Sequence, residues 1–193
     1  MNSTTLRTIT RSLAAIATVA IFAACAYDAP TSYGDGTSPK RDLLGDRPVD
    51  LGSCDSLAVT DASLHAFDMF GVGVQIYRWD GATWRFVAPR ADLYGDAAGN
   101  GLVGTHFGGP TWKSKGGSSV VGTTIRRCTP DANSIPWLLL TGTPDGEPGV
   151  FEKVKLLQRL QTVGGNAPST PGSVIGEVRE VAYTALYRFY QSQ

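Results

Sequence analysis

The histidine at position 106 has the clearest chemical potential of any residue in this sequence. His106 is one of two histidines in the chain and lies in the stretch "GLVGTHFGGPTW", flanked by glycines and followed by Trp112. Its imidazole can serve as a general base, a metal ligand or a hydrogen-bonding group toward a ligand, because an ordinary histidine titrates near neutral pH. An isolated histidine in a strand more often has a structural role, in which a backbone carbonyl satisfies the ring. The sequence alone leaves both interpretations of His106 open.

Neither a metal nor a cofactor is expected near this histidine. A metal needs three or four convergent donors, and the only other histidine is His65. Gly71 and Gly73 begin a dinucleotide fingerprint, but Ile76 occupies the place of its third glycine. The segment that follows is also expected to form a hairpin, not the helix whose N-terminus would hold a pyrophosphate.

Four other side chains are candidates for a ligand site with His106. An aromatic ring can form the wall of a cleft for a sugar or another small molecule, although core packing is the usual role of tryptophan. Amide and guanidinium groups on strand faces can bind a ligand or close a buried polar network. The candidates of these types are Trp112, Gln75, Gln158 and Arg159. Arg159 lies among leucines, where a guanidinium is costly unless paired, so a carboxylate of the chain or an anionic ligand would explain it.

These residues allow three functional hypotheses. The leading one is a non-enzymatic binding module that holds a small polar or carbohydrate-like ligand near His106, Trp112 and Arg159. The second is a hydrolase or lyase with His106 as general base and Arg159 as anion stabiliser, although the sequence offers neither an activated nucleophile nor a pair of catalytic carboxylates. The third is a purely structural envelope protein whose motifs specify the fold.

The elements that must position these residues are expected to be strands. From residue 51 onward, short apolar runs alternate with Gly, Pro and Asp, which predicts an all-β, mainly antiparallel sandwich or barrel with little helix. The last run, "VAYTALYRFY", alternates at period two. Its apolar face holds Val181, Tyr183, Ala185, Tyr187 and Phe189. The opposite face, with Thr184 and Arg188, is expected to meet water.

Turn residues indicate where several other strands begin and end. Asp80-Gly81 predicts a hairpin, and Asn100-Gly101 is expected to open a strand. A further hairpin is expected to turn at 115–117. The run "IPWLLLTG" is interpreted as a fully buried strand, and "VFEKVKLLQRLQT" fits a strand slightly better than a helix.

The first 50 residues are interpreted as an export signal and a tether. Residues 1–24 have two arginines, the apolar run "LAAIATVAIFAA" and then small residues, which is the layout of a signal peptide. The run ends in "FAAC", which resembles the lipobox of bacterial lipoproteins, with Phe22 where leucine is usual. We therefore expect lipidation of Cys25, a flexible tether over 25–50 and one domain over 51–193, anchored to a membrane of the bacterial cell envelope. Ordinary cleavage, which would give a secreted or periplasmic protein, is the alternative.

The remaining cysteines and the charges set further bounds. Cys54 and Cys128 are expected to form a disulfide, because an exported chain meets an oxidising compartment. Lys plus Arg and Asp plus Glu each number 17, so the chain carries no formal net charge. Nucleic-acid binding needs clustered positive charge, so no nucleic-acid partner is expected.

A set of ordered motifs supports a family resemblance. The stretches are "GVQIYRW", "GTHFGGPTW", "SSVVG", "IPWLLL", "LQRLQTVGGNAP" and "YTALYRFY". In this order they resemble the bacterial and fungal family called domain of unknown function 3455, over most of the chain after the tether. The resemblance implies an exported, β-rich protein. The positions that match recurrent family residues are His106, Pro110, Trp112, Gln75, Gln158, Arg159, Thr162, Gly164, Gly165, Pro168 and Tyr183. Tyr183 thereby joins the candidate ligand-binding residues.

The chain also departs from the family's pattern. Members often carry one cysteine after "IYR" and another after "AP", where this chain has Trp79 and the stretch "STPGS". The resemblance implies that one disulfide is lost here and that Cys54 and Cys128 replace its constraint elsewhere. Members also often have Asp-Gly-Ser after the tryptophan, whereas this chain has Lys115-Gly116-Gly117-Ser118. Any chemistry of that aspartate in relatives is therefore missing here.

Overall fold

The fold is a closed antiparallel β-barrel. The computed structural model describes residues 49–60 and 63–192. Eight strands follow one another around the barrel in sequence order, and β8 pairs back with β1. The strands are β1 (Leu64–Trp79), β2 (Trp84–Tyr94), β3 (Leu102–Phe107), β4 (Thr111–Ser114), β5 (Ser119–Cys128), β6 (Trp137–Pro144), β7 (Val154–Gly164) and β8 (Val178–Gln191). The 3-10 helix η1 (Gly52–Leu57) precedes them. The all-β prediction is confirmed, and its barrel alternative is the observed one. The export signal, Cys25 and the tether up to residue 48 lie outside the described residues.

The predicted turns form the hairpins as expected. Between β1 and β2, the Asp80 carboxylate accepts backbone N–H bonds from Ala82 and Thr83, and Gly81 adopts a φ of 101°. These bonds, together with Arg85, hold the pKa of Asp80 far below its ordinary value. Gly117 turns between β4 and β5 with a φ of 103°. Both turns need the left-handed backbone that glycine adopts without strain.

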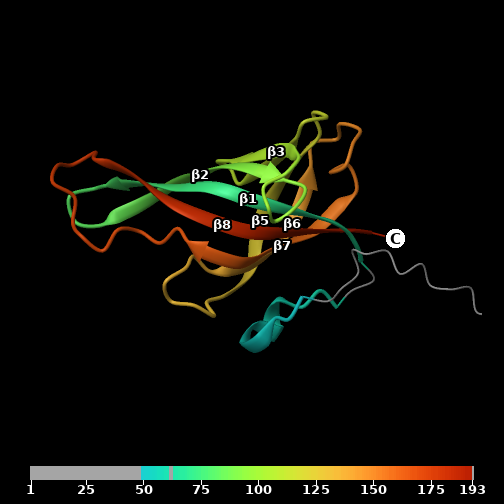
Figure 1. The fold of residues 1–193 in the computed structure, drawn as a ribbon, viewed down its shortest axis with the longest axis horizontal. Coiled ribbons are helices and arrows are strands. Elements are labelled where there is room, and N and C mark those ends of the chain that lie inside the picture. Colours follow the sequence, from blue (N-terminus) through green and yellow to red (C-terminus); the bar gives the residue numbers. More distant parts are fainter. Residues whose placement is uncertain (1–48, 61–62, 193) are drawn as a thin grey trace, which may run out of the picture. The chain divides into compact units, whose positions relative to one another are not determined.

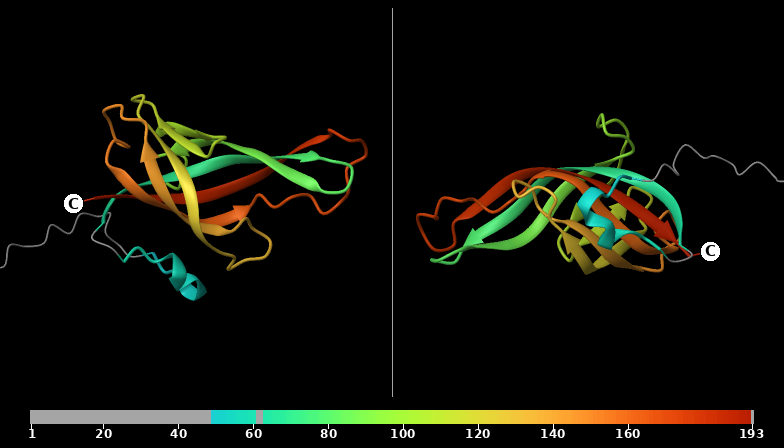
Figure 2. Two further views of the ribbon diagram at one scale, coloured as in Figure 1. Left: turned by 180° about the vertical axis from the view of Figure 1, so that it is seen from behind. Right: turned by 90° about the horizontal axis from the view of Figure 1, so that it is seen from below.

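The two longest strands, β1 and β8, form an arm together with β2. The β1–β8 ladder runs from Leu64 opposite Gln191 to Arg78 opposite Val178, and β2 continues along the other edge of β1. Figure 1 shows β1, β2 and β8 projecting past the shorter strands, and both views in Figure 2 agree. The barrel wall therefore extends further along the barrel axis at β1 and β8 than at the short strands β3 and β4.

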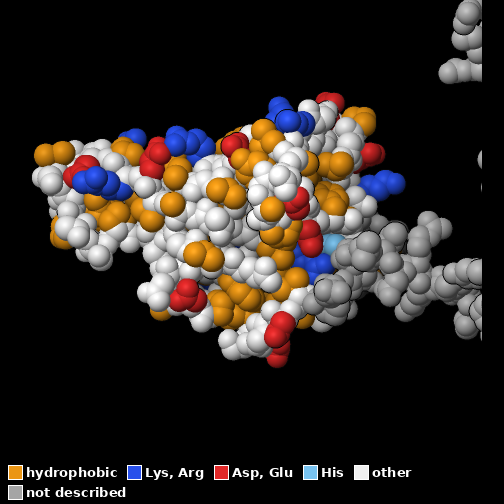
Figure 3. Space-filling model, in the orientation of Figure 1, with side chains coloured by type: hydrophobic (Ala, Val, Ile, Leu, Met, Phe, Trp, Pro, Cys, Tyr) orange, Lys and Arg blue, Asp and Glu red, His pale blue; other side chains and the backbone are white. Residues whose placement is uncertain are grey.

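Charges on the arm are paired. Arg85 contacts Asp80 at 2.6 Å, and Arg90 contacts Glu180 at the same distance. On the face shown in Figure 3, basic and acidic side chains are intermixed along the arm and over the barrel. No broad region of one sign covers this face.

The last strand confirms its predicted apolar face, and on the opposite face Thr184 is exposed as predicted whereas Arg188 is not. Tyr183, Ala185, Tyr187 and Phe189 are all buried inside the barrel. Arg188 was expected to meet water, and this was wrong, because its side chain is 4% exposed and its Nε lies 3.0 Å from Oδ1 of Asp68. A strand has one buried and one exposed face only where other residues pack against one side of it. A second layer of residues packs on the outer face of β8, so side chains on both faces of this strand are buried.

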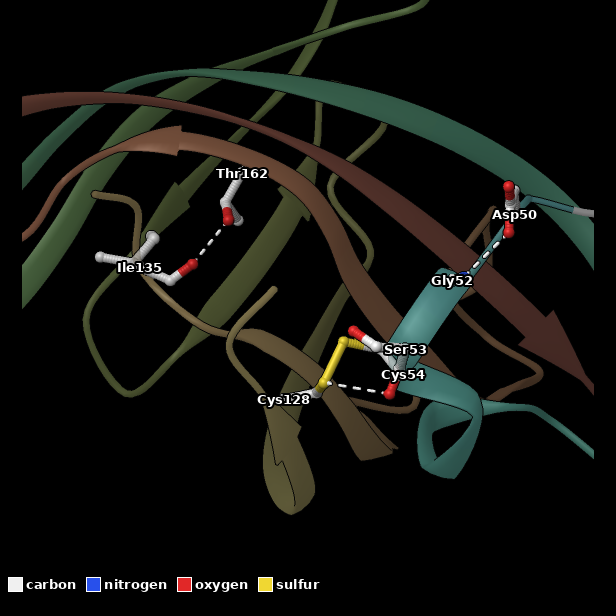
Figure 4. The surroundings of a disulfide bond; sticks show 7 residues. All are labelled: Asp50, Gly52, Ser53, Cys54, Cys128, Ile135 and Thr162. Carbon is white, nitrogen blue, oxygen red and sulfur yellow. Dashed lines mark hydrogen bonds between the residues drawn. A yellow bond between two sulfur atoms is a disulfide. The ribbon is translucent and has the colours of Figure 1, made fainter. Parts of the chain in front are cut away.

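That second layer is the segment around η1. Leu57 packs against Leu160 and Leu186 on the outer faces of β7 and β8. The disulfide between Cys54 and Cys128 joins η1 to the end of β5, with a Cα–Cα distance of 5.7 Å (Figure 4). The predicted bridge is confirmed. It ties the outer layer to the barrel, which gives the protein two apolar clusters.

The two clusters explain two features of the neighbouring strands. In β6, Leu139 packs under η1 while Leu140 packs inside the barrel, so consecutive leucines are both buried. The expectation of a fully buried strand was wrong, because Thr141 and Thr143 of β6 are exposed. In β7, the predicted strand is confirmed, and two register shifts break its alternation. One of them includes Gln161, whose φ is 49°.

Candidate functional site

A cavity of about 390 Å³ lies inside the barrel next to the base of the arm. Buried apolar side chains, among them Ile135 and Leu140, form part of its lining. Phe86 and Val87 of β2 also line it and are 54% and 50% exposed, so they mark its mouth. The cavity also brings together four of the six predicted ligand-binding residues. These are Gln75 of β1, His106 of β3, Trp112 of β4 and Arg159 of β7.

His106 and Trp112 form a stacked pair across neighbouring strands. They are opposite each other in the β3–β4 ladder, with ring centroids 4.2 Å apart and planes inclined by 14°. Tyr187 of β8 packs edge-on against both rings, with centroids at 5.3 Å. Gly104 is required beside them, because a Cβ there would collide with the Lys113 carbonyl of β4. One glycine of the motif thus allows the close strand approach that places the pair.

The protonation state of His106 follows from its surroundings. Its Nδ1 lies 2.8 Å from the Thr111 carbonyl oxygen, which only accepts, so Nδ1 carries the proton and Nε2 presents a lone pair. Burial lowers the pKa of His106 to about 3; the Thr111 bond opposes this effect and the charge of Arg159 adds to it. The ring is therefore neutral at physiological pH. The backbone-carbonyl contact is the one expected of a structural histidine.

Arg159 is a largely buried cation without a carboxylate partner. Its Nε and Nη2 both donate to the Pro136 carbonyl oxygen, at 3.1 and 2.8 Å. None of the ion pairs between described residues includes it. Burial lowers the pKa of Arg159, and the charge of Arg127 lowers it further. The sequence allowed two partners for Arg159, a carboxylate of the chain or an anionic ligand. No such carboxylate is found among the residues that the structure describes.

Two buried N–H donors in the cavity lining have no acceptor. They are Nε2 of Gln75 and Nε1 of Trp112, and each residue is 2% exposed. The Gln75 amide lies near enough to the Tyr183 hydroxyl to lower the pKa of Tyr183, but without the geometry of a full hydrogen bond. Buried polar groups are satisfied in more than about nine cases out of ten, so two orphans in one cavity need an explanation. Both belong to residues that the sequence had singled out for ligand binding.

The two remaining candidates lie apart from the cavity lining. The Tyr183 hydroxyl is 3.0 Å from that of Tyr187, and burial raises the pKa of both. Tyr183 therefore supports the ring that packs on His106. Gln158 lies on the outer face of β7, where it donates to the Leu57 carbonyl and accepts from the Tyr190 hydroxyl. Its amide closes a polar network under η1.

Sequence reasoning missed several lining residues. Arg127 is exposed and lines the cavity, while its neighbour Arg126 bonds the Ser56 carbonyl. Tyr77 also lines the cavity, and its hydroxyl donates to the Gly165 carbonyl at 2.7 Å. Strand register decides which of two adjacent arginines faces the cavity, and no local signal gives that register.

The motif "LQRLQTVGGNAP" builds one wall of the cavity. The Thr162 hydroxyl donates to the Ile135 carbonyl (Figure 4), and the Ile135 amide donates to the Gly164 carbonyl. Ile135 and Pro136 are thereby held against β7, where both line the cavity. Outside Arg159, the motif's contribution is structural.

The two places where family members often carry cysteines lie together in space. A Cβ on Gly172, within the "STPGS" stretch, would lie 2.5 Å from Cγ of the Trp79 ring. Backbone bonds also join Trp79 to Gly176 and Glu177. This proximity fits the interpretation that relatives bridge these two segments of the arm, where this chain packs a tryptophan on a glycine.

Other kinds of site are not found within residues 49–60 and 63–192. No group of three or more His, Cys, Asp or Glu side chains there is placed to hold a metal ion. No helix in those ranges has the length and apolar character needed to span a membrane. The cavity lining includes the hydroxyl of Thr124 but no Ser, Cys, Asp or Glu, so it offers no acidic group.

Comparison with known proteins gives one match. The sequence profile of a family described as "Protein of unknown function (DUF3455)" matches residues 61–191, which include all eight strands. No curated protein and no solved structure matched the chain. The match spans well over half of the sequence and agrees with the resemblance carried by its ordered motifs. The chain therefore belongs to the DUF3455 family of proteins of unknown function.

Proposed function

We propose that this barrel is a binding module that holds a small polar or carbohydrate-like ligand in the cavity at the base of its arm. The observation that carries the proposal is the pair of acceptor-less donors, on Gln75 and Trp112, in the wall of a cavity of about 390 Å³. Small-molecule sites typically have volumes of about 300–1,000 Å³ and combine apolar walls with a few polar groups. The volume and the lining both fit that description.

A purely structural role is a poorer explanation of these donors. An unsatisfied buried donor costs about 1–3 kcal/mol, and an apolar side chain of similar shape at positions 75 and 112 would avoid that cost. A ligand that supplies the missing acceptors explains why polar side chains stand there. Residues that serve recognition commonly lower the stability of the native state at binding sites.

An enzymatic role has less support. A pKa of about 3 makes Nε2 of His106 a weak base at neutral pH, whereas an efficient general base has a pKa near the working pH. The lining also lacks a catalytic carboxylate, and its hydroxyl on Thr124 has no general base with a pKa near neutrality beside it. Binding needs no strong base and no catalytic carboxylate, because Nε2 of His106 can simply accept a hydrogen bond from a ligand hydroxyl or N–H.

The binding test compares two glutamines on different faces of the barrel. A panel of sugars, organic acids and amino acids is screened by thermal shift against the full chain. We expect at least one compound to raise the melting temperature of the wild type, because a ligand that binds only the native state stabilises it. Gln75→Leu should reduce that ligand-induced shift. Gln158→Leu, which alters the outer face, should retain it whatever its own melting temperature.

Two results would contradict the proposal. One is the absence of any ligand-induced shift across the whole panel. The other is an equal loss of the shift in Gln75→Leu and Gln158→Leu, which would mean that the effect does not depend on the cavity.

We also propose that the barrel is exported and displayed on a membrane of the bacterial envelope. The support is the signal-like segment 1–24, the lipobox-like "FAAC" and the composition of 25–50. The disulfide also fits an oxidising compartment. Lipid on Cys25 would then anchor the chain, because each buried methylene contributes about 0.8 kcal/mol.

Lipidation predicts a specific labelling result. When the full chain is expressed in a bacterium fed an alkyne-tagged fatty acid, the wild type should carry the label and sediment with membranes. Cys25→Ser should lose both properties because it removes the acylated sulfur. A labelled Cys25→Ser variant, or an unlabelled soluble wild type, would refute the anchor without touching the binding proposal.

A further inference from the structure

The charge of the cavity lining is one-sided. Arg159 and Arg127 both line the cavity, and no Asp or Glu does. They lie close enough that the charge of Arg127 lowers the pKa of Arg159. Neither arginine takes part in an ion pair between described residues. The cavity wall therefore carries a positive charge that no described carboxylate neutralises.

The buried guanidinium is only partly satisfied by the chain. A guanidinium has five N–H groups, and the single Pro136 carbonyl receives bonds from Nε and Nη2 of Arg159. No described residue accepts a bond from its Nη1. Taking such a cation out of water is costly unless a counter-charge and further acceptors replace its hydration. Arg159 is half-buried, and no carboxylate of the described cavity wall neutralises it, so an anion in the cavity would supply the counter-charge that the chain does not.

The two neutral N–H donors without an acceptor, on Trp112 and Gln75, would also be satisfied by an anion. Nε1 of Trp112 can only donate, and Nε2 of Gln75 is a donor as well. Together with Arg159, they form a set of donors around one cavity that contains no carboxylate. A carboxylate has two oxygens that accept several bonds and match the planar guanidinium. One such group can satisfy both the charge and the orphan donors.

The remainder of the lining is mostly apolar. Ile135, Leu138 and Leu140 lie within the cavity, and Phe86 and Val87 stand at its mouth. These side chains have no polar atoms to offer a ligand, so they suit a hydrocarbon or aromatic body. Of the two arginines in the lining, Arg127 is exposed and Arg159 is half-buried. Only Arg159 is partly shielded from water, which favours a ligand with one negative charge over the two of a phosphate group.

The geometry points to a small carboxylic acid with an apolar body as the ligand, its carboxylate bound by Arg159 with N–H bonds from Trp112 and Gln75. This inference rests on the proposed binding function and names the chemical class that the site selects. It narrows the polar or carbohydrate-like ligand to an anionic one. His106 presents Nε2 as an acceptor for a hydroxyl or N–H elsewhere on such a molecule.

Matched pairs of compounds test the inference on the wild-type chain. Benzoate is compared with benzamide, and hexanoate with hexanamide, by calorimetry and by ¹⁵N NMR at low and high salt, with inorganic phosphate as a further probe. We expect each carboxylate to bind about tenfold or more tightly than its amide, because the amide has no charge for the guanidinium. The indole N–H resonance of Trp112 should move on binding. That of Trp84 should stay, because its N–H already donates to the Thr170 carbonyl.

Variants locate the charge that binds the carboxylate. Arg159→Met removes the buried cation and keeps the length of the side chain, so benzoate affinity should fall about tenfold or more while benzamide affinity stays unchanged. Arg126→Met is the control, because it removes an equal charge from a side chain that bonds the Ser56 carbonyl outside the lining. It should leave both affinities as in the wild type.

The outcomes distinguish a failure of the carboxylate assignment from a failure of the proposed binding function. Equal binding of amides and carboxylates, tighter binding of phosphate than of carboxylates, or equal losses in Arg159→Met and Arg126→Met would overturn the carboxylate assignment and leave a binding module. Absence of binding by every compound, charged or neutral, would overturn the inference, and the proposed function would fall with it only if the sugars, organic acids and amino acids of the thermal-shift panel also gave no shift. If Arg159→Met does not fold, the indole resonances of the wild type still decide between carboxylate and amide.

Discussion

Acidification from pH 7 to pH 4.5 should lower the free energy of unfolding by about 3 kcal/mol through His106 alone. The imidazole has a pKa of about 3 in the native barrel against 6.5 in an unfolded chain. Between those values the unfolded state binds a proton that the native state does not. Stability is therefore full above pH 6.5 and falls as the pH drops toward 3. The carboxylates with lowered pKa values act at lower pH, which is why the range stops at 4.5.

The measurement is urea denaturation at several pH values between 7 and 4.5. The wild type should show the loss, whereas His106→Gln, which has no titrating ring, should be less stable at pH 7 but nearly independent of pH. His65→Gln is the matched control, because it removes the other histidine, whose Nε2 bonds Asp68. That variant should keep the decline. A decline of wild-type size in His106→Gln would show that other groups cause it.

Removing the disulfide should cost about 4 kcal/mol of unfolding free energy. The bridge joins residues 74 apart in sequence, and a loop of that length loses much conformational freedom in the unfolded chain. The native state should change as well, because the bridge holds Leu57 over Leu160 and Leu186. The variant replaces Cys54 and Cys128 together by alanine, so that no free thiol remains.

Urea denaturation with and without reductant checks this prediction. Reductant should lower the stability of the wild type to that of the double alanine variant and leave the variant unchanged. A loss below about 1 kcal/mol, within the scatter of surface substitutions, would contradict a stabilising bridge. An effect of reductant on the double variant would point to a cause other than this bridge.

The sequence predicts the strands of this barrel better than their arrangement. Turn residues such as Asp80-Gly81 and the apolar side of the period-two run 181–189 are local signals, and the structure confirms the turn and the buried apolar side chains from Tyr183 to Phe189. Closure into a barrel depends on pairing between Leu64–Trp79 and Val178–Gln191, which are far apart in the chain and leave no trace in local periodicity. The burial of Arg188 was missed for a related reason, because the layer that covers the outer face comes from η1.

The candidate site shows the same limit. Residue types and glycine-rich context singled out Gln75, His106, Trp112 and Arg159, and the structure places all four around one cavity. Gln158 and Arg159 were both candidates in sequence, yet neighbouring strand residues face opposite sides. Only the register of β7, with its two shifts, assigns the arginine to the interior and the glutamine to the layer under η1.

The long ladder between the first and last strands also fixes the order of events in time. β1 needs β8 along nearly its whole length, so the barrel cannot close until the last residues of the chain have been synthesised. Contacts between such distant segments form slowly, which places closure among the late steps of folding. During synthesis the chain therefore remains an open set of hairpins. For a protein proposed to be exported, that delay keeps the polypeptide unfolded, and so able to cross a membrane, until β8 has been synthesised.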